Sequence, residues 1–204
     1  MNHDLPPAPQ FGDALPVTAA PAVLAFLARR RSASALSLRG PAPTDSELTD
    51  LLTLAARVPD HGKLSPWRFI VLTGEAKAAF AARLDAIAVA RPDGHKLQAK
   101  LGKLKAPPLG VAVVSRTVEG DIPVWEQQLS AGAVCTTLLY AATAMGYGAN
   151  WITDWYAYDA EARAALGLST DEQVAGFVFI GTSAEPPQER VRPGVAALTT
   201  VWKP

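Results

Sequence analysis

Apolar positions recur at helical spacing in two stretches near the start of the chain. Residues 18–30 show this spacing, which predicts a first helix with Thr18 as its cap and Pro21 in its first turn. The run Thr44-Asp45-Ser46-Glu47 has the form of a capping box and is followed by leucines at helical spacing. It predicts a second helix that is stopped by Pro59.

Four further helical stretches are predicted downstream. One spans residues 75–90, and a lysine-rich helical stretch follows the turn at residues 91–94. A long helix, without charge after Glu126, is expected from Pro123 to Met145, with Gly146 as its C-cap. A brief helix over residues 161–166 is closed by Gly167.

Short apolar runs between these helices predict strands. They cover residues 67–72, 109–115 and 174–180, and residues 150–154 form a short strand or a turn. Strands separated by helices indicate a layered α/β or α+β domain. Strand order and direction stay open at this point. Residues 1–17 are rich in proline and predict a poorly ordered arm, which leaves residues 18–204 as one domain.

Residues 129–149 carry no charge and are long enough to span a bilayer. Alanine, glycine and threonine dominate them, however, and no polybasic flank follows, so we expect a core helix rather than a membrane span. The first eleven residues lack the features of a secretory signal, and a cytoplasmic location is expected.

Composition removes several classes of function. The 19 basic and 19 acidic side chains cancel, which argues against a nucleic-acid partner. Cys135 is the one cysteine and the three histidines are scattered, so no metal site is expected. The signatures of nucleophilic hydrolases, phosphate-binding loops and zinc helices are missing. An enzyme without an evident acid, base or nucleophile is typical of chemistry carried by a cofactor.

Several short motifs follow one another along the chain. They are Arg30-Arg31-Ser32, Arg57-Val58-Pro59-Asp60-His61, Trp125-Glu126-Gln127 with Ser130-Ala131-Gly132, Gly146-Tyr147-Gly148-Ala149-Asn150-Trp151 and residues 176–182. In this order and spacing the set resembles the nitroreductase family, and specifically its compact NAD(P)H-dependent branch. The resemblance runs from about Val23 onward and leaves the proline-rich arm outside.

The resemblance implies a fold, a cofactor and an assembly. The fold would be an α+β, three-layer α/β/α sandwich with a mainly antiparallel central sheet flanked by helices. FMN would lie at the interface of a homodimer and carry the chemistry, so no side chain is expected to be catalytic. NADH or NADPH would donate a hydride to flavin N5, and a nitroaromatic, a quinone or a similar electron-poor molecule would then take the electrons in a ping-pong cycle.

The same resemblance assigns residues to the flavin. Arg30, Arg31 and Ser32 look like the family's contacts to the FMN phosphate, ribityl chain and pyrimidine edge. The other expected contacts are Arg57 and His61 from the partner subunit, Trp151, Ile152 and Thr153 beside the flavin, and Arg192 at the phosphate. Ser34 and Ile152 stand where many members have arginine, which puts those individual contacts in doubt.

Each of these residues also has a simpler interpretation. The run Arg29–Arg31 suits the C-terminal end of a helix dipole, His61 could be an exposed loop residue, and Arg192 a solvated charge. Three other functions stay open: different flavin chemistry on the same fold (dehalogenation, flavin fragmentation, enoate or azo reduction), a non-catalytic flavin-binding module, and a membrane-associated interaction protein. The acceptor and the choice between NADH and NADPH are not determined.

Overall fold

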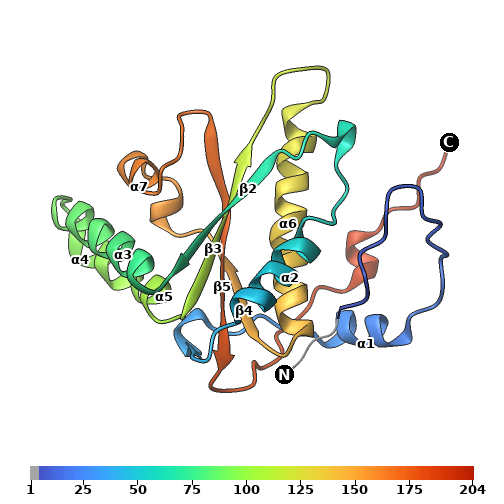
Figure 1. The fold of residues 1–204 in the computed structure, drawn as a ribbon, viewed down its shortest axis with the longest axis horizontal. Coiled ribbons are helices and arrows are strands. Elements are labelled where there is room, and N and C mark those ends of the chain that lie inside the picture. Colours follow the sequence, from blue (N-terminus) through green and yellow to red (C-terminus); the bar gives the residue numbers. More distant parts are fainter. Residues whose placement is uncertain (1–4) are drawn as a thin grey trace.

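A computed structural model describes residues 5–204, and the strands within them form a single five-stranded sheet (Figure 1). Its central strand pairs with three others, and every pairing is antiparallel. The strands are β1 (Leu38–Arg39), β2 (Trp67–Thr73), β3 (Leu109–Arg116), β4 (Gly148–Ile152) and β5 (Glu172–Ser183). β3 lies along one edge of β5 and β2 lies outside β3, while β4 and β1 share the other edge of β5.

Helices cover both faces of this sheet and make a three-layer sandwich. α2 and α6 pack on one face, and α3, α5 and α7 pack on the other, where α4 lies against α3 and α5 (Figure 1). The helices are α1 (Pro21–Arg29), α2 (Asp45–Ala55), α3 (Gly74–Val89), α4 (Gly94–Lys100), α5 (Gly102–Lys105), α6 (Val124–Ala144) and α7 (Ala160–Ala165). Short 3-10 helices are η1 (Ala35–Ser37), η2 (His61–Lys63), η3 (Trp155–Ala157) and η4 (Val195–Leu198). The expected α+β sandwich with an antiparallel sheet is confirmed.

Alternation along β5 explains the two cores. Val178 and Ile180 are fully buried beneath α2 and α6, whereas Phe177 and Phe179 are fully buried on the opposite face. Successive side chains of a strand point to opposite faces, so a strand covered on both sides is apolar throughout. Tyr156 packs edge-on against Phe177 at 4.9 Å between ring centroids and extends the second core.

The long helix α6 is buried along one face only. Val134, Cys135 and Leu138 are completely buried against the sheet, while Trp125 and Leu129 remain 67% and 54% exposed. No helix within residues 5–204 is long and apolar enough to cross a membrane. The expected core helix is therefore present, with an uncovered apolar strip on its outer side.

Predicted boundaries differ from the structure at several elements, and β5 (Glu172–Ser183) extends past the predicted residues 174–180 at both ends. α1 begins at Pro21 and Ala20 takes the N-cap position, so Thr18 does not cap it. The residue before a proline is driven away from the helical region, which prevents an earlier start. The short strand β4 starts two residues before residue 150 and ends at Ile152, since Asp154 turns the chain by accepting a hydrogen bond from the Trp155 N–H.

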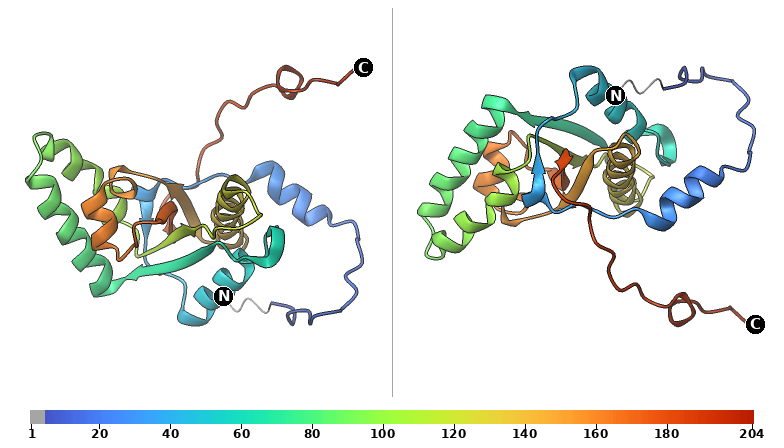
Figure 2. Two further views of the ribbon diagram at one scale, coloured as in Figure 1. Left: turned by 90° about the horizontal axis from the view of Figure 1, so that it is seen from above. Right: turned by 90° about the horizontal axis from the view of Figure 1, so that it is seen from below.

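Both terminal segments run out from the sandwich (Figure 2). Residues 5–20 form no helix or strand, and all of them are exposed. Residues 1–4 of the predicted arm lie outside the described residues. That the arm is poorly ordered, and that residues 18–204 are one domain, stay predictions. After β5, residues 184–204 form an exposed tail that contains only η4.

Candidate functional site

The segment that follows α1 is tied to the start of β4. The Ala33 N–H donates to the Ala149 carbonyl at 3.0 Å, and the Asn150 side-chain amide donates back to the Ala33 carbonyl. Arg30 ends the helix with extended backbone angles, so the chain continues as a straight segment across the sheet edge. The three residues Arg30, Arg31 and Ser32 are thereby held at a defined position.

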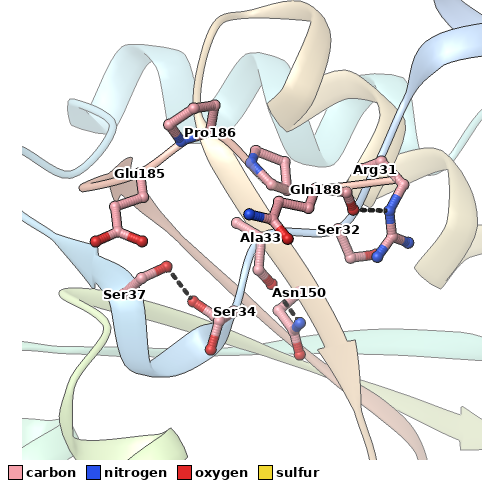
Figure 3. A pocket seen from close by; sticks show the side chains of 10 residues that line it. Arg31, Ser32, Ala33, Ser34, Ser37, Asn150, Glu185, Pro186 and Gln188 are labelled. Atoms are coloured by element: carbon pink, nitrogen blue, oxygen red, sulfur yellow. Dashed lines mark hydrogen bonds between the residues drawn. The ribbon is translucent and has the colours of Figure 1, made fainter. Parts of the chain in front are cut away.

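A pocket of about 500 Å³ opens beside this segment (Figure 3). Its size is in the range typical of sites for small molecules and cofactors. In Figure 3 the segment after α1 and the start of the C-terminal tail face each other across it. The lining residues are Arg31, Ser32, Ala33, Ser34, Ser37, Asn150, Glu185, Pro186, Pro187 and Gln188.

Arg31 lies at the rim of the pocket with part of its guanidinium unused. Its Nε donates to the Gln188 carbonyl at 2.8 Å and lies 3.6 Å from Glu189 Oε1. The two terminal nitrogens make no hydrogen bond within the described chain. They are therefore available as a fork for a phosphate or a carbonyl edge.

Glu189 lies between two of the predicted site residues. Its carboxylate accepts from Arg192 Nε at 3.1 Å and also faces Arg31. The backbone N–H of Arg190, together with Arg192 and Arg31, holds the pKa of Glu189 below its ordinary value. Arg31 and Arg192 thus converge on one anionic group beside the pocket, although Arg192 itself does not line the pocket.

Arg30 carries a buried donor that finds no acceptor. Its Nη2 donates to Ser32 Oγ at 3.2 Å, and its guanidinium lies 5.5 Å above the centre of the Tyr140 ring. Its Nε is buried and has no hydrogen-bond partner among the described residues. This atom is enclosed by the chain itself, and Arg30 does not line the pocket, so it adds no donor there.

Arg57 and His61 are located elsewhere. Arg57 is exposed just after α2, and its side chain makes no hydrogen bond within the described chain. His61 belongs to η2, where its Nδ1 is 2.7 Å from Glu126 Oε2 at the start of α6. Neither residue lines the pocket beside Arg31.

The three predicted residues around the end of β4 point in different directions. Trp151 is 39% exposed and donates from Nε1 to the Ala175 carbonyl at 3.3 Å. Ile152 packs against the second core, and Thr153 accepts a hydrogen bond from the Tyr158 hydroxyl. None of them lines the pocket, whereas their neighbour Asn150 does.

Sequence reasoning missed Asn150, Ser37 and Gln188 as lining residues. Asn150 carried a signal, because a polar residue between the Gly-x-Gly run and Trp151 is out of place in an apolar strand. Ser37 and Gln188 carried none, since only the fold brings them together. The described residues contain no group of three or more His, Cys, Asp or Glu side chains placed to hold a metal ion.

Comparisons with known proteins agree on one family. The model described as "Nitroreductase family" matches residues 27–182. A relative from Escherichia coli strain K12, named "Putative NAD(P)H nitroreductase YdjA", is 35% identical over 78% of this chain and 87% of its own. A relative of the same general name from Haemophilus influenzae is 33% identical over 83% of this chain and 92% of its own.

Solved structures share the fold. A nitroreductase-like protein from Bacillus cereus superposes with a TM-score of 0.79 at 18% identity, over 92% of this chain and 98% of its own. A structure described as a nitroreductase with bound FMN, from Bacteroides fragilis, gives a TM-score of 0.67 at 20% identity, over 89% and 98%. At these identities the likeness concerns the fold.

Proposed function

The chain belongs to the nitroreductase family, and from this membership we propose that it is an FMN-dependent NAD(P)H oxidoreductase acting on small electron-poor acceptors. The names of its relatives refer to NAD(P)H, and a solved structure of the same fold is described with bound FMN. Nitroaromatic compounds and quinones are the acceptor classes that we propose, and the cytoplasm is the proposed location.

The observation that supports this most directly is the convergence of Arg31 and Arg192 on one carboxylate beside a pocket of about 500 Å³. A phosphate carries more charge than the Glu189 carboxylate and offers more acceptor oxygens. It would therefore displace Glu189 and take up both guanidinium groups.

Three of the residues that line the pocket have polar groups suited to holding the cofactor. Ser32 and Asn150 offer a hydroxyl and an amide to the ribityl chain and the ring edge, and Arg31 offers the free end of its guanidinium. FMN, when bound, accepts a hydride from NAD(P)H and passes two electrons to the acceptor. With Arg31 engaged by the phosphate, Arg57 is the positive group that would stabilise negative charge at the pyrimidine edge.

We further propose a homodimer with the flavin sites at its interface. α1 buries none of its residues, and Val23, Leu24 and Leu27 are 54%, 68% and 46% exposed. A short helix with an uncovered apolar side is not stable alone in water. Further exposed apolar side chains lie on the strip of α6 and in the tail, where they are Val191, Val195, Leu198, Val201 and Trp202.

The dimer also accounts for the separation of the predicted site residues. Arg57 and His61 do not line the pocket of their own chain. In a two-fold dimer, residues of one protomer that lie near the interface can line the pocket of the other protomer. We propose that Arg57 and His61 complete the partner's pocket in this way.

An absorbance spectrum of the purified protein tests the function. Bands of oxidised flavin that bleach on anaerobic addition of NADPH or NADH, and return on addition of a nitroaromatic or a quinone, are expected. A colourless protein that takes up no FMN on reconstitution would contradict the proposal. Bound flavin that no nicotinamide reduces would favour a flavin-binding module instead.

A further inference from the structure

Some of the predicted flavin residues do not line the pocket. Among their side-chain hydrogen bonds, the contact between His61 and Glu126 is the shortest. His61 Nδ1 lies 2.7 Å from Glu126 Oε2, although the two residues are 65 positions apart in the sequence. An ionised carboxylate only accepts hydrogen bonds. The ring must therefore carry its proton on Nδ1 for this contact to form, and Nε2 is the nitrogen that remains available.

The loop that bears His61 is held by hydrogen bonds to backbone groups both before and after this residue in the chain. Ser130 of α6 donates from its hydroxyl to the Pro59 carbonyl at 2.6 Å. The Asp60 carboxylate accepts from the Leu64 and Ser65 N–H groups at 3.2 and 2.9 Å. These bonds hold the backbone around His61 against the first turns of α6.

The helix start that bears Glu126 is equally fixed. The neighbouring Gln127 is 3% exposed, accepts from the Val118 N–H at 2.8 Å, and donates to the carbonyls of Val118 and Ile122 at 2.9 and 3.0 Å. Ile122 in turn lies against Gly62: a Cβ added to Gly62 would be 3.3 Å from Cγ1 of Ile122. Both ends of the contact are therefore positioned by groups other than the contact itself.

We propose that Glu126 is a positioning residue for His61, which it orients so that Nε2 faces the flavin site shared with the partner subunit. The inference rests on the proposed function, since it takes His61 as a cofactor contact. A role in folding stability does not explain the pair, because the side chains are 62% and 45% exposed and exposed ion pairs contribute little.

Control of the tautomer has a direct chemical consequence. With Nδ1–H committed to Glu126, Nε2 accepts a hydrogen bond when the ring is neutral and donates one when the ring is protonated. Without the carboxylate, the ring is free to rotate and to exchange tautomers. Either Nδ1 or Nε2 could then face the flavin site. Carboxylate partners fix histidine ligands of metal ions in the same way.

The test uses the full-length protein with histidine labelled by nitrogen-15, and compares Glu126→Ala, Glu126→Gln and the control Glu161→Ala. Glu161 is also an exposed, ion-paired glutamate, but it contacts Arg91 on the opposite side of the sandwich. The chain has three histidines, and a His61→Asn variant assigns the His61 signals. Both the tautomer of the flavin-free protein and its FMN affinity are measured.

We expect neutral His61 to carry its proton on Nδ1 in the wild type and in Glu126→Gln, whose amide oxygen accepts the same bond. In Glu126→Ala the Nε2–H form should dominate, and the dissociation constant for FMN should rise about tenfold. Glu126→Gln should stay within about threefold of the wild type.

Two results would overturn the inference while leaving the proposed function intact. One is an unchanged tautomer in Glu126→Ala. The other is a changed tautomer in a variant that binds FMN as tightly as the wild type and Glu161→Ala. If the wild type itself takes up no FMN, the proposed function fails first and this inference fails with it.

Discussion

The indole of Trp151 occupies the space in which a side chain at position 176 would lie. A Cβ placed on Gly176 would come 1.8 Å from Trp151 Nε1, a distance at which one of the two groups must move. Trp151 is held there by a hydrogen bond to the neighbouring Ala175 carbonyl. Glycine at position 176 is therefore required for Trp151 to cover β5.

Substituting Gly176 by alanine should destabilise the protein by about 1 to 3 kcal/mol, because the added methyl group overpacks the sheet under the indole. Urea unfolding measures the change. The cost should shrink in a Trp151→Ala background, where the space is empty. Gly194→Ala, at a position with open space around it, serves as the control. Equal costs in both backgrounds would contradict the packing described.

Substituting Arg31 by alanine should raise the dissociation constant for FMN about tenfold to a hundredfold, as a charge-assisted hydrogen bond is lost. Quenching of flavin fluorescence on titration measures it. Arg83→Ala removes an exposed arginine from α3, far from the pocket, and should change nothing. Unchanged flavin affinity in Arg31→Ala would mean that Arg31 has no contact with the cofactor.

Substituting Leu129 by glutamate should convert the proposed dimer into monomers and release the flavin, because a charge would enter the uncovered strip of α6. Sedimentation distinguishes the 21.5 kDa chain from a species of twice that mass. Val89→Glu is the matched control, since Val89 is 68% exposed on α3. A monomeric wild type would rule out the proposed assembly.

The ion pair of Arg68 with Glu172 should make stability depend on acid pH. Hydrogen bonds from Arg68 and from the Ser169 N–H lower the pKa of Glu172 to about 2. An unfolded chain takes up this proton near pH 4.3, so the stabilisation is complete above about pH 5 and is lost between about pH 5 and pH 2.

Glu172→Gln should therefore lower stability at pH 7 by about 2 to 3 kcal/mol and flatten the acid limb of the stability curve. Chemical denaturation across the pH range from 2 to 8 gives both values. Glu161→Gln alters an exposed pair and should leave the curve near that of the wild type. Parallel curves for Glu172→Gln and the wild type would show that the pair does not titrate as described.

Cys135 should resist thiol reagents in the folded protein. Burial in α6 raises the pKa of its thiol to about 12, and the thiolate is the reactive form. We expect labelling at pH 8 to be about a thousandfold slower than for a free thiol. In guanidinium chloride one thiol per chain should react at the ordinary rate. Rapid labelling of the native protein would show that α6 is not packed as described.

Local signals in the sequence were sufficient for most elements. The capping box at Thr44 and Glu47 is present with both of its hydrogen bonds. α6 lies within one residue of its expected bounds, with Pro123 as its N-cap and Met145, not the predicted Gly146, as its C-cap. Such features depend on neighbours within one helical turn. The strand β1 was missed, because two residues carry no periodicity and owe their pairing to Thr182 and Ser183.

The candidate site was predicted less completely than the fold. Arg31 and Ser32 do line the pocket, and their motif is contiguous. Gln188 and Asn150 reach the same pocket through the tail and through β4, which are contacts of high sequence separation that no local pattern records. The flavin contacts assigned to all of the predicted residues stay predictions. These residues are Arg30, Arg31, Ser32, Arg57, His61, Trp151, Ile152, Thr153 and Arg192.

The central place of β5 also sets the order in which the molecule can form. β1, β3 and β4 all pair with this strand, which comes last of the five along the chain. During synthesis β1, β3 and β4 therefore cannot complete their pairing with β5 until residue 183 has left the ribosome. Loop closure over such distances is slow, and until then the apolar faces of β3 and β4 are exposed to other chains. Premature termination before β5 would leave only the β2–β3 pair of the sheet, because β1 and β4 pair with β5 alone among the described strands.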